Sequence, residues 1–154
     1  MTNENSLVWR RAASEDVPLL ARINRELIEH EWGGVSKSLE HLEARLQRWI
    51  SDPTYTALVF SRGEKFVAYT LLHLYPDEAY IRHFYVSPQA RSAGMGRQVC
   101  EIVLREFVPP GVRVSLDVLT SNQSGLRFWR SIGFRDYSVV MELYNGRPAA
   151  VEAA

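Results

Sequence analysis

Two glycines and two arginines stand close together in the middle of the chain, at Arg91, Gly94, Gly96 and Arg97. Glycine lets the backbone turn tightly, so that successive N–H groups can converge at the start of a helix. Such a helix end binds phosphate, and guanidinium groups suit phosphate oxygens. We therefore expect residues 91–97 to hold a phosphate group of a ligand.

Other phosphate-binding loops fit this stretch poorly. A Walker A loop would have lysine and then serine or threonine after its last glycine, where this chain has Arg97 and Gln98. A dinucleotide-binding loop would have a third glycine, and position 99 is valine. An ordinary surface turn would need neither flanking arginines nor a helix directly after it. A functional loop of another kind is the better interpretation.

The loop is predicted to connect a strand to a helix. Residues 79–86 alternate with a period of two, which places Tyr80, Arg82, Phe84 and Val86 on one face and Ile81, His83 and Tyr85 on the other. After the loop, apolar residues recur at helical spacing at Val99, Cys100, Val103, Leu104 and Phe107.

Two motifs resemble those of one family. The stretch Arg91-Ser92-Ala93-Gly94-Met95-Gly96 resembles the Arg-x-x-Gly-x-Gly signature of the GCN5-related N-acetyltransferase (GNAT) superfamily. Residues 122–129, with Gly133 and Phe134 after them, are similar to that family's Asn-x-x-Ala-x-x-Phe-Tyr…Gly-Phe segment. Residues 24–32, 81–86 and 128–130 look like bacterial relatives of the small-molecule, aminoglycoside type.

The resemblance implies an α+β (mixed α/β) fold with a central mixed, mostly antiparallel sheet of six to seven strands and about four helices. We expect one domain over residues 1–144 and a flexible tail over 145–154. The expected elements, in order, are a strand at 7–12, helices from Ser14 to about His30 and from Ser36 or Ser38 to Ile50, strands at 55–61, 66–75 and 79–86, a helix from Arg97, a strand at 112–119, a helix at 124–132 and one or two strands within 134–144.

Acetyl-CoA is the donor that the resemblance implies. In the family the loop holds its pyrophosphate, and the strand ending at Val86 parts from the strand beginning at Val112, so that backbone N–H groups face the pantetheine arm. The residues expected to contact acetyl-CoA are Phe84, Tyr85, Val86, Arg91, Ser92, Ala93, Gly94, Met95, Gly96, Arg97, Asn122, Phe128 and Trp129.

An amine acceptor must lose a proton before it attacks a thioester, which calls for a base. His83 is one candidate, because an unperturbed imidazole titrates near pH 6.5; a packed strand residue is the favoured alternative. Glu31 is another, since it ends a cluster with Glu26, Glu29 and His30 where relatives form the acceptor rim. A solvated helix end would give the same cluster.

Trp129 occupies the position where many relatives have a tyrosine that protonates the leaving thiolate. An indole N–H donates a hydrogen bond but does not titrate usefully. Either Tyr137 or Tyr85 acts through water, or the thiolate, with a pKa near 8.5, leaves without an acid.

Composition excludes several other functions. Lys+Arg and Asp+Glu both number 18, so no basic surface suggests nucleic acid. No apolar run approaches the roughly 20 residues that span a bilayer, and the first six residues do not resemble a signal peptide, so we expect no membrane partner. Cys100 is the single cysteine, which suggests a buried thiol in the cytoplasm. His41 and His73 lack metal-ligand spacing, and we expect no metal.

The sequence thus predicts a bacterial, cytoplasmic N-acetyltransferase. It would transfer the acetyl group of acetyl-CoA to a primary amine of a small molecule by direct attack in a ternary complex. A non-catalytic acyl-CoA-binding module, which Trp129 would suit, and an enzyme that acetylates protein N-termini or lysines are the alternatives. Dimers are common in the family, so a homodimer is one expected assembly.

Overall fold

The computed structural model describes residues 5–31, 37–91 and 94–146. Four α-helices and five strands follow one another in the predicted order. They are β1 (Leu7–Arg11), α1 (Val17–Glu31), α2 (Leu39–Ser51), β2 (Tyr55–Arg62), β3 (Lys65–Leu74), β4 (Glu78–Val86), α3 (Met95–Phe107), β5 (Arg113–Ser115) and α4 (Gln123–Ile132), with short 3-10 turns at Ser14–Asp16 and Pro88–Ala90.

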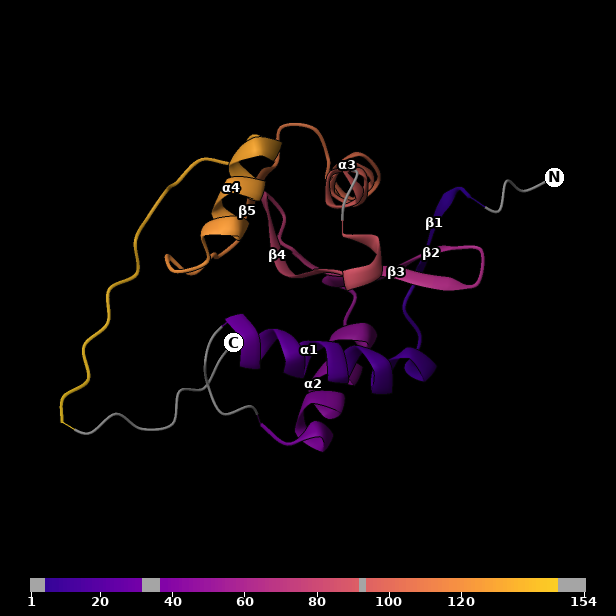
Figure 1. The fold of residues 1–154 in the computed structure, drawn as a ribbon, viewed down its shortest axis with the longest axis horizontal. Helices are drawn as coiled ribbons and strands as arrows, with labels where there is room; N and C mark the ends of the chain where they lie inside the picture. Colours follow the sequence, from indigo (N-terminus) through magenta and orange to yellow (C-terminus); the bar gives the residue numbers. More distant parts are fainter. Residues whose placement is uncertain (1–4, 32–36, 92–93, 147–154) are drawn as a thin grey trace.

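The strands form one sheet in the order β1-β2-β3-β4-β5. The first four pair antiparallel, and β5 pairs parallel to β4. Figure 1 shows α1 and α2 on one side of this sheet and α3 on the other. The predicted fold class, a mixed and mostly antiparallel sheet flanked by helices, is confirmed.

Each face of the sheet has its own core. On one face, Leu20 of α1 and Leu42 and Leu46 of α2 pack without exposure against Tyr69 and Leu71 of β3. On the other face, Val99 and Val103 of α3 pack with Phe60, Ala68 and Leu72. Cys100 on α3 is also fully buried, as predicted.

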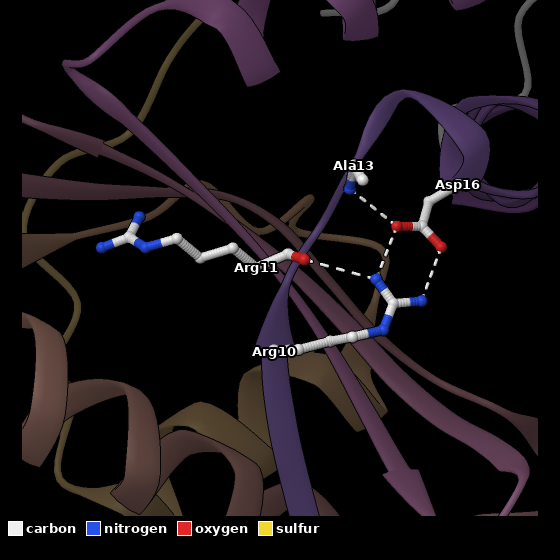
Figure 2. A network of polar contacts seen from close by, with 4 residues as sticks. All are labelled: Arg10, Arg11, Ala13 and Asp16. Atoms are coloured by element: carbon white, nitrogen blue, oxygen red, sulfur yellow. Dashed lines mark hydrogen bonds and ion pairs between the residues drawn. The ribbon is translucent and has the colours of Figure 1, made fainter.

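A polar network joins the end of β1 to the start of α1 (Figure 2). The carboxylate of Asp16 accepts hydrogen bonds from both terminal nitrogens of Arg10, each at 2.7 Å. It also accepts the backbone N–H of Ala13 at 2.7 Å, which satisfies a donor that the helix start would leave free. The network links the end of β1 to the 3-10 turn that leads into α1.

A bulge interrupts β4 at Arg82. His83 pairs with Leu71 and Ile81 pairs with Leu72, so Arg82 is an extra residue on β4. Ile81 therefore packs in the α3 core, whereas Tyr85 packs in the α1–α2 core. The predicted strict alternation, which placed Ile81, His83 and Tyr85 on one face, is wrong at this point.

β5 is shorter than the predicted strand at 112–119. It pairs with β4 over three residues, from Arg113 opposite Glu78 to Ser115 opposite Tyr80, and residues 116–119 carry no strand. The two strands therefore diverge after Ser115, as the resemblance implied.

The predicted closing strands within 134–144 are absent from the structure, and these residues contain neither helix nor strand. After α4 the chain runs away from the sheet, drawn in yellow in Figure 1. Most of the predicted tail lies outside the described residues. Among the helices that are described, none has the length and apolar composition needed to cross a bilayer.

Candidate active site

The larger of two adjoining clefts, here named the loop cleft, opens where β4, the start of α3 and α4 meet. Its volume is about 540 Å³. Every predicted acetyl-CoA contact that the structure describes lines it; Ser92 and Ala93 lie outside the described residues. These lining residues are Phe84, Tyr85, Val86, Arg91, Gly94, Met95, Gly96, Arg97, Asn122, Phe128 and Trp129.

The structure requires glycine at the two loop positions for different reasons. Gly94 precedes α3 with φ of +76°, a left-handed conformation that most side chains avoid, and a Cβ there would meet nothing within 4 Å. A Cβ on Gly96 would lie 2.9 Å from Cε2 of Phe128. Gly94 therefore sets the turn, and Gly96 lets α4 approach the first turn of α3.

Two arginines line the same cleft, each anchored by one hydrogen bond. Nε of Arg91 donates to the carbonyl oxygen of Val86 at 2.8 Å, and Nη2 of Arg97 donates to the carbonyl oxygen of Ser131 at 2.8 Å. These bonds fix the side chains and leave their other N–H groups available. Two guanidinium groups and the N-terminus of α3 together make this end of the cleft suitable for an anion.

The smaller cleft, here named the inner cleft, lies between α1, β4 and residues 116–119, where β4 and β5 diverge. Its volume is about 120 Å³. Asp117 and Tyr80 face each other across it: the hydroxyl of Tyr80 donates to Oδ2 of Asp117 at 2.6 Å. Burial and this bond raise the pKa of Tyr80. The cleft therefore presents a carboxylate and a protonated phenol.

Five residues line both clefts: Leu27, Glu31, Phe84, Asn122 and Trp129. Of these, Glu31 is the one that titrates. Desolvation raises the pKa of Glu31 above its usual range, against the opposing effect of Arg91. Asn122 also caps α4, accepting the N–H of Gly125 at 3.0 Å. Where the two clefts meet, the carboxylate of Glu31, with its raised pKa, therefore shares the lining with the aromatic rings of Phe84 and Trp129.

His83 also lines the inner cleft but is only 6% exposed. Its Nε2 lies 3.4 Å from Nδ2 of Asn24 and its Nδ1 lies 3.3 Å from the hydroxyl of Tyr69. Desolvation, with a smaller contribution from Arg45 and Arg82, lowers the pKa of His83 to about 3. The imidazole is therefore neutral at ordinary pH and accepts a proton only weakly.

Other predicted residues lie away from the two clefts or only border one of them. Tyr137 is 75% exposed, and its ring lies 4.6 Å from the guanidinium carbon of Arg113. Glu26, Glu29 and His30 line neither cleft. Tyr85 borders the loop cleft, but its side chain packs in the α1–α2 core, where burial raises its pKa.

The sequence reasoning missed Tyr80, Asp117 and the buried Asn24. A carboxylate inside the apolar run 114–119 was an available signal for Asp117. Asn24 depends on a contact distant in sequence: its Oδ1 accepts Nη2 of Arg45 at 2.7 Å. No cluster of three or more metal-ligating side chains occurs within residues 5–31, 37–91 and 94–146.

Comparison with known proteins gives the family. Residues 23–134 match the model of the acetyltransferase (GNAT) family, so the chain belongs to that family and is an N-acetyltransferase. The sequence matches none of the curated proteins.

Solved structures share the fold. An acetyltransferase from Thermus thermophilus is 26% identical, with a TM-score of 0.68 over 84% of this chain and 87% of that one. A predicted acetyltransferase from Clostridium acetobutylicum, solved with acetyl-CoA, is 17% identical, with a TM-score of 0.69 over 90% and 96%. An aminoglycoside acetyltransferase from an uncultured soil metagenomic sample, in complex with sisomicin, is 20% identical, with a TM-score of 0.65 over 92% and 97%.

Gly94→Asp should weaken acetyl-CoA binding at least about tenfold relative to Gly94→Asn. Both side chains tolerate the left-handed conformation, and the site has room for either, so they differ mainly in charge. Isothermal titration with acetyl-CoA measures the difference. Equal affinities of the two variants would show that the loop does not face the pyrophosphate.

His83 should make the protein less stable in acid. The folded chain keeps the imidazole neutral down to about pH 3, whereas the unfolded chain protonates it near pH 6.5. Lowering the pH below about 6.5 therefore favours unfolding, by up to about 1.4 kcal/mol per pH unit. Urea unfolding between pH 7.5 and 5 should show a shallower slope for His83→Gln and an unchanged slope for His41→Gln, an exposed control. In the native wild type, an NMR titration of His83 near pH 6.5 would contradict this account.

Proposed function

We propose that the protein transfers the acetyl group of acetyl-CoA to a primary amine of a small molecule, by direct attack within a ternary complex. The observation that carries the proposal is the shared wall of the two clefts. The loop cleft, at about 540 Å³, has a cationic end, made by Arg91 and Arg97, that suits a pyrophosphate. The inner cleft, at about 120 Å³, has room for the amine end of an acceptor.

The acceptor amine would enter the inner cleft as an ammonium ion. Asp117 offers a carboxylate that attracts it, and Glu31 at the junction takes a proton, directly or through water. A carboxylate of raised pKa is a stronger base than an ordinary one. His83, being neutral and buried, serves here as a packed polar residue that holds Asn24 and Tyr69 in place.

The neutral nitrogen then attacks the thioester carbonyl carbon. β4 has no strand partner beyond Tyr80 on the side of β5 in the described chain, so backbone N–H groups near Phe84 can face the oxyanion. One such donor is worth about 3 kcal/mol of barrier. The C–S bond breaks, the nitrogen loses its second proton, and the thiolate becomes the thiol of CoA. Trp129 can donate a hydrogen bond to the sulfur but no proton.

Two observations bear on the mechanism and on the acceptor. Cys100 stays a thiol, because burial raises its pKa to about 11, so an acetyl-cysteine intermediate is not part of the proposal. An aminoglycoside is bound by one structural neighbour, which supports a small polyamine as the first acceptor class to test.

Release of CoA thiol, followed with a panel of small amines and lysine peptides, tests the proposal. Turnover with peptides alone, or with no amine, would refute it.

Glu31→Gln should lower kcat/KM for the amine by about 10²- to 10³-fold while leaving acetyl-CoA affinity nearly unchanged. The loss should shrink at pH values above the acceptor's own pKa, where the amine is already neutral. Glu29→Gln, on the same helix but lining neither cleft, is the matched control. An equal loss in both variants, or none in Glu31→Gln, would remove Glu31 from the mechanism.

A further inference from the structure

Arg82 is a half-buried cation that lines the inner cleft without an anionic partner. Within the described part of the chain its side chain forms no hydrogen bond and no ion pair, and its Nε is enclosed by protein atoms with no acceptor. The sequence places no acidic residue at 32–36 either. A charge that leaves bulk water usually has a partner, because its desolvation is costly. A ligand that enters the cleft can supply the missing anion.

Two aromatic rings hold the guanidinium group of Arg82. Its carbon Cζ lies 5.1 Å from the ring centre of Trp49 and 5.6 Å from that of Tyr80. A guanidinium is attracted to the faces of such rings, and these contacts give its N–H groups no oxygen acceptor. Because Nε is enclosed, the terminal N–H groups are the ones that a ligand can meet. Their fork matches a carboxylate, which can accept two parallel hydrogen bonds.

A second cation, Arg45 of α2, lies close to the first. Its Cζ is 4.7 Å from the ring centre of Trp49, and its Nη2 donates to Oδ1 of Asn24 at 2.7 Å. Asn24 itself lines the inner cleft. Desolvation lowers the pKa of Arg45, and the neighbouring charge of Arg82 lowers it further. Two like charges thus lie near each other at this cleft, and an anion bound at Arg82 would offset their repulsion.

Tyr80 has a cation near its ring and a carboxylate at its hydroxyl. The guanidinium of Arg82 contacts the ring, and the hydroxyl donates to Oδ2 of Asp117 at 2.6 Å. Arg82 and Asp117 therefore line one cleft and contact one side chain, yet no ion pair joins them in the described chain. A cleft of about 120 Å³ that presents both charges suits a small molecule that carries both opposite charges.

We propose that the inner cleft binds an amino acid as the acceptor, with its carboxylate on the guanidinium of Arg82 and its amine at Asp117 and Glu31. This inference rests on the proposed function and narrows its acceptor class. Holding both ends of the molecule fixes which nitrogen faces the thioester. Arg82 binds the acceptor and takes no part in the acetyl transfer itself. A polyamine would bring a cation against Arg82, so repulsion should make it a poor acceptor.

Common amino acids and their carboxamides are matched acceptors, because the two members of each pair have nearly the same size and differ in charge. The carboxamide has the less basic amine, so it would react faster if the carboxylate made no contact. Release of CoA thiol should nevertheless give a kcat/KM at least about tenfold higher for the best amino acid than for its carboxamide. An equal or faster carboxamide, or turnover of diamines and polyamines alone, would overturn the inference and leave the proposed function standing.

Arg82→Met removes the charge and keeps most of the side-chain stem. It should lower kcat/KM for the amino acid by about 10- to 100-fold and leave that for the carboxamide within a fewfold. Arg82→Lys should restore part of the loss, because it keeps the charge without the fork. Arg22→Met, at an exposed arginine of α1 that lines neither cleft, is the matched control. Equal losses for the acid and the carboxamide would show a merely structural role for Arg82 and contradict the inference.

Binding in the absence of an acetyl group separates this inference from the proposed function. With CoA bound no transfer can occur, so isothermal titration with each common amino acid measures affinity alone. The wild type should bind the best of them at least about tenfold more tightly than Arg82→Met does. Such binding without turnover of any amine would keep the amino-acid site and refute the proposed function. Equal affinities of the two proteins, or no binding to either, would overturn the inference whatever the activity.

Discussion

The site depends on the short length over which β4 and β5 pair. Parallel pairing lasts for three residues, after which the strands part and neither completes the other's ladder. Backbone groups need partners, so a gap in a sheet persists only if water or a ligand can enter it. Here α1 and α4 close the sides of the gap and leave two clefts that meet. A sheet paired along its whole length would have buried the same residues and offered no junction at Glu31 and Trp129.

The polar interior beside this gap is arranged around a neutral histidine. Arg45 of α2 contacts Asn24 of α1, Asn24 contacts His83 of β4, and His83 contacts Tyr69 of β3. Arg45 and Arg82 both lie over Trp49, at 4.7 and 5.1 Å from its ring. Two guanidinium groups so close to a buried imidazole oppose its protonation. Arg82 lines the inner cleft together with the carboxylates of Asp117 and Glu31.

The sequence predicts the structure correctly where the signal lies in residues close together in the chain. The order of the elements up to α4, the start of α2 at one of two predicted serines, Ser38, and the loop residues lining one cleft follow from residue type and spacing, helped by the family motifs. It failed where the cause is distant in sequence. The bulge at Arg82 depends on register with β3, and the burial of His83 depends on α1 and α2. Residues 134–144 have a strand-like pattern but pair with no strand of the described sheet. The pocket contact of Asp117 with Tyr80 joins residues 37 positions apart.

The extra residue at Arg82 also determines which residues of β4 can be deleted without changing the faces of the others. Two consecutive side chains, those of Arg82 and His83, both approach Trp49 of α2, whereas Ile81 faces α3. Removing Arg82 alone would therefore leave Ile81, His83 and Tyr85 on their present faces and make the strand regular. Removing one residue from the regular part that follows would instead turn the remainder of β4 over, because side chains alternate there. Among variants with one residue deleted from β4, those lacking residue 82 should therefore still fold, and those lacking one of residues 83–86 should not.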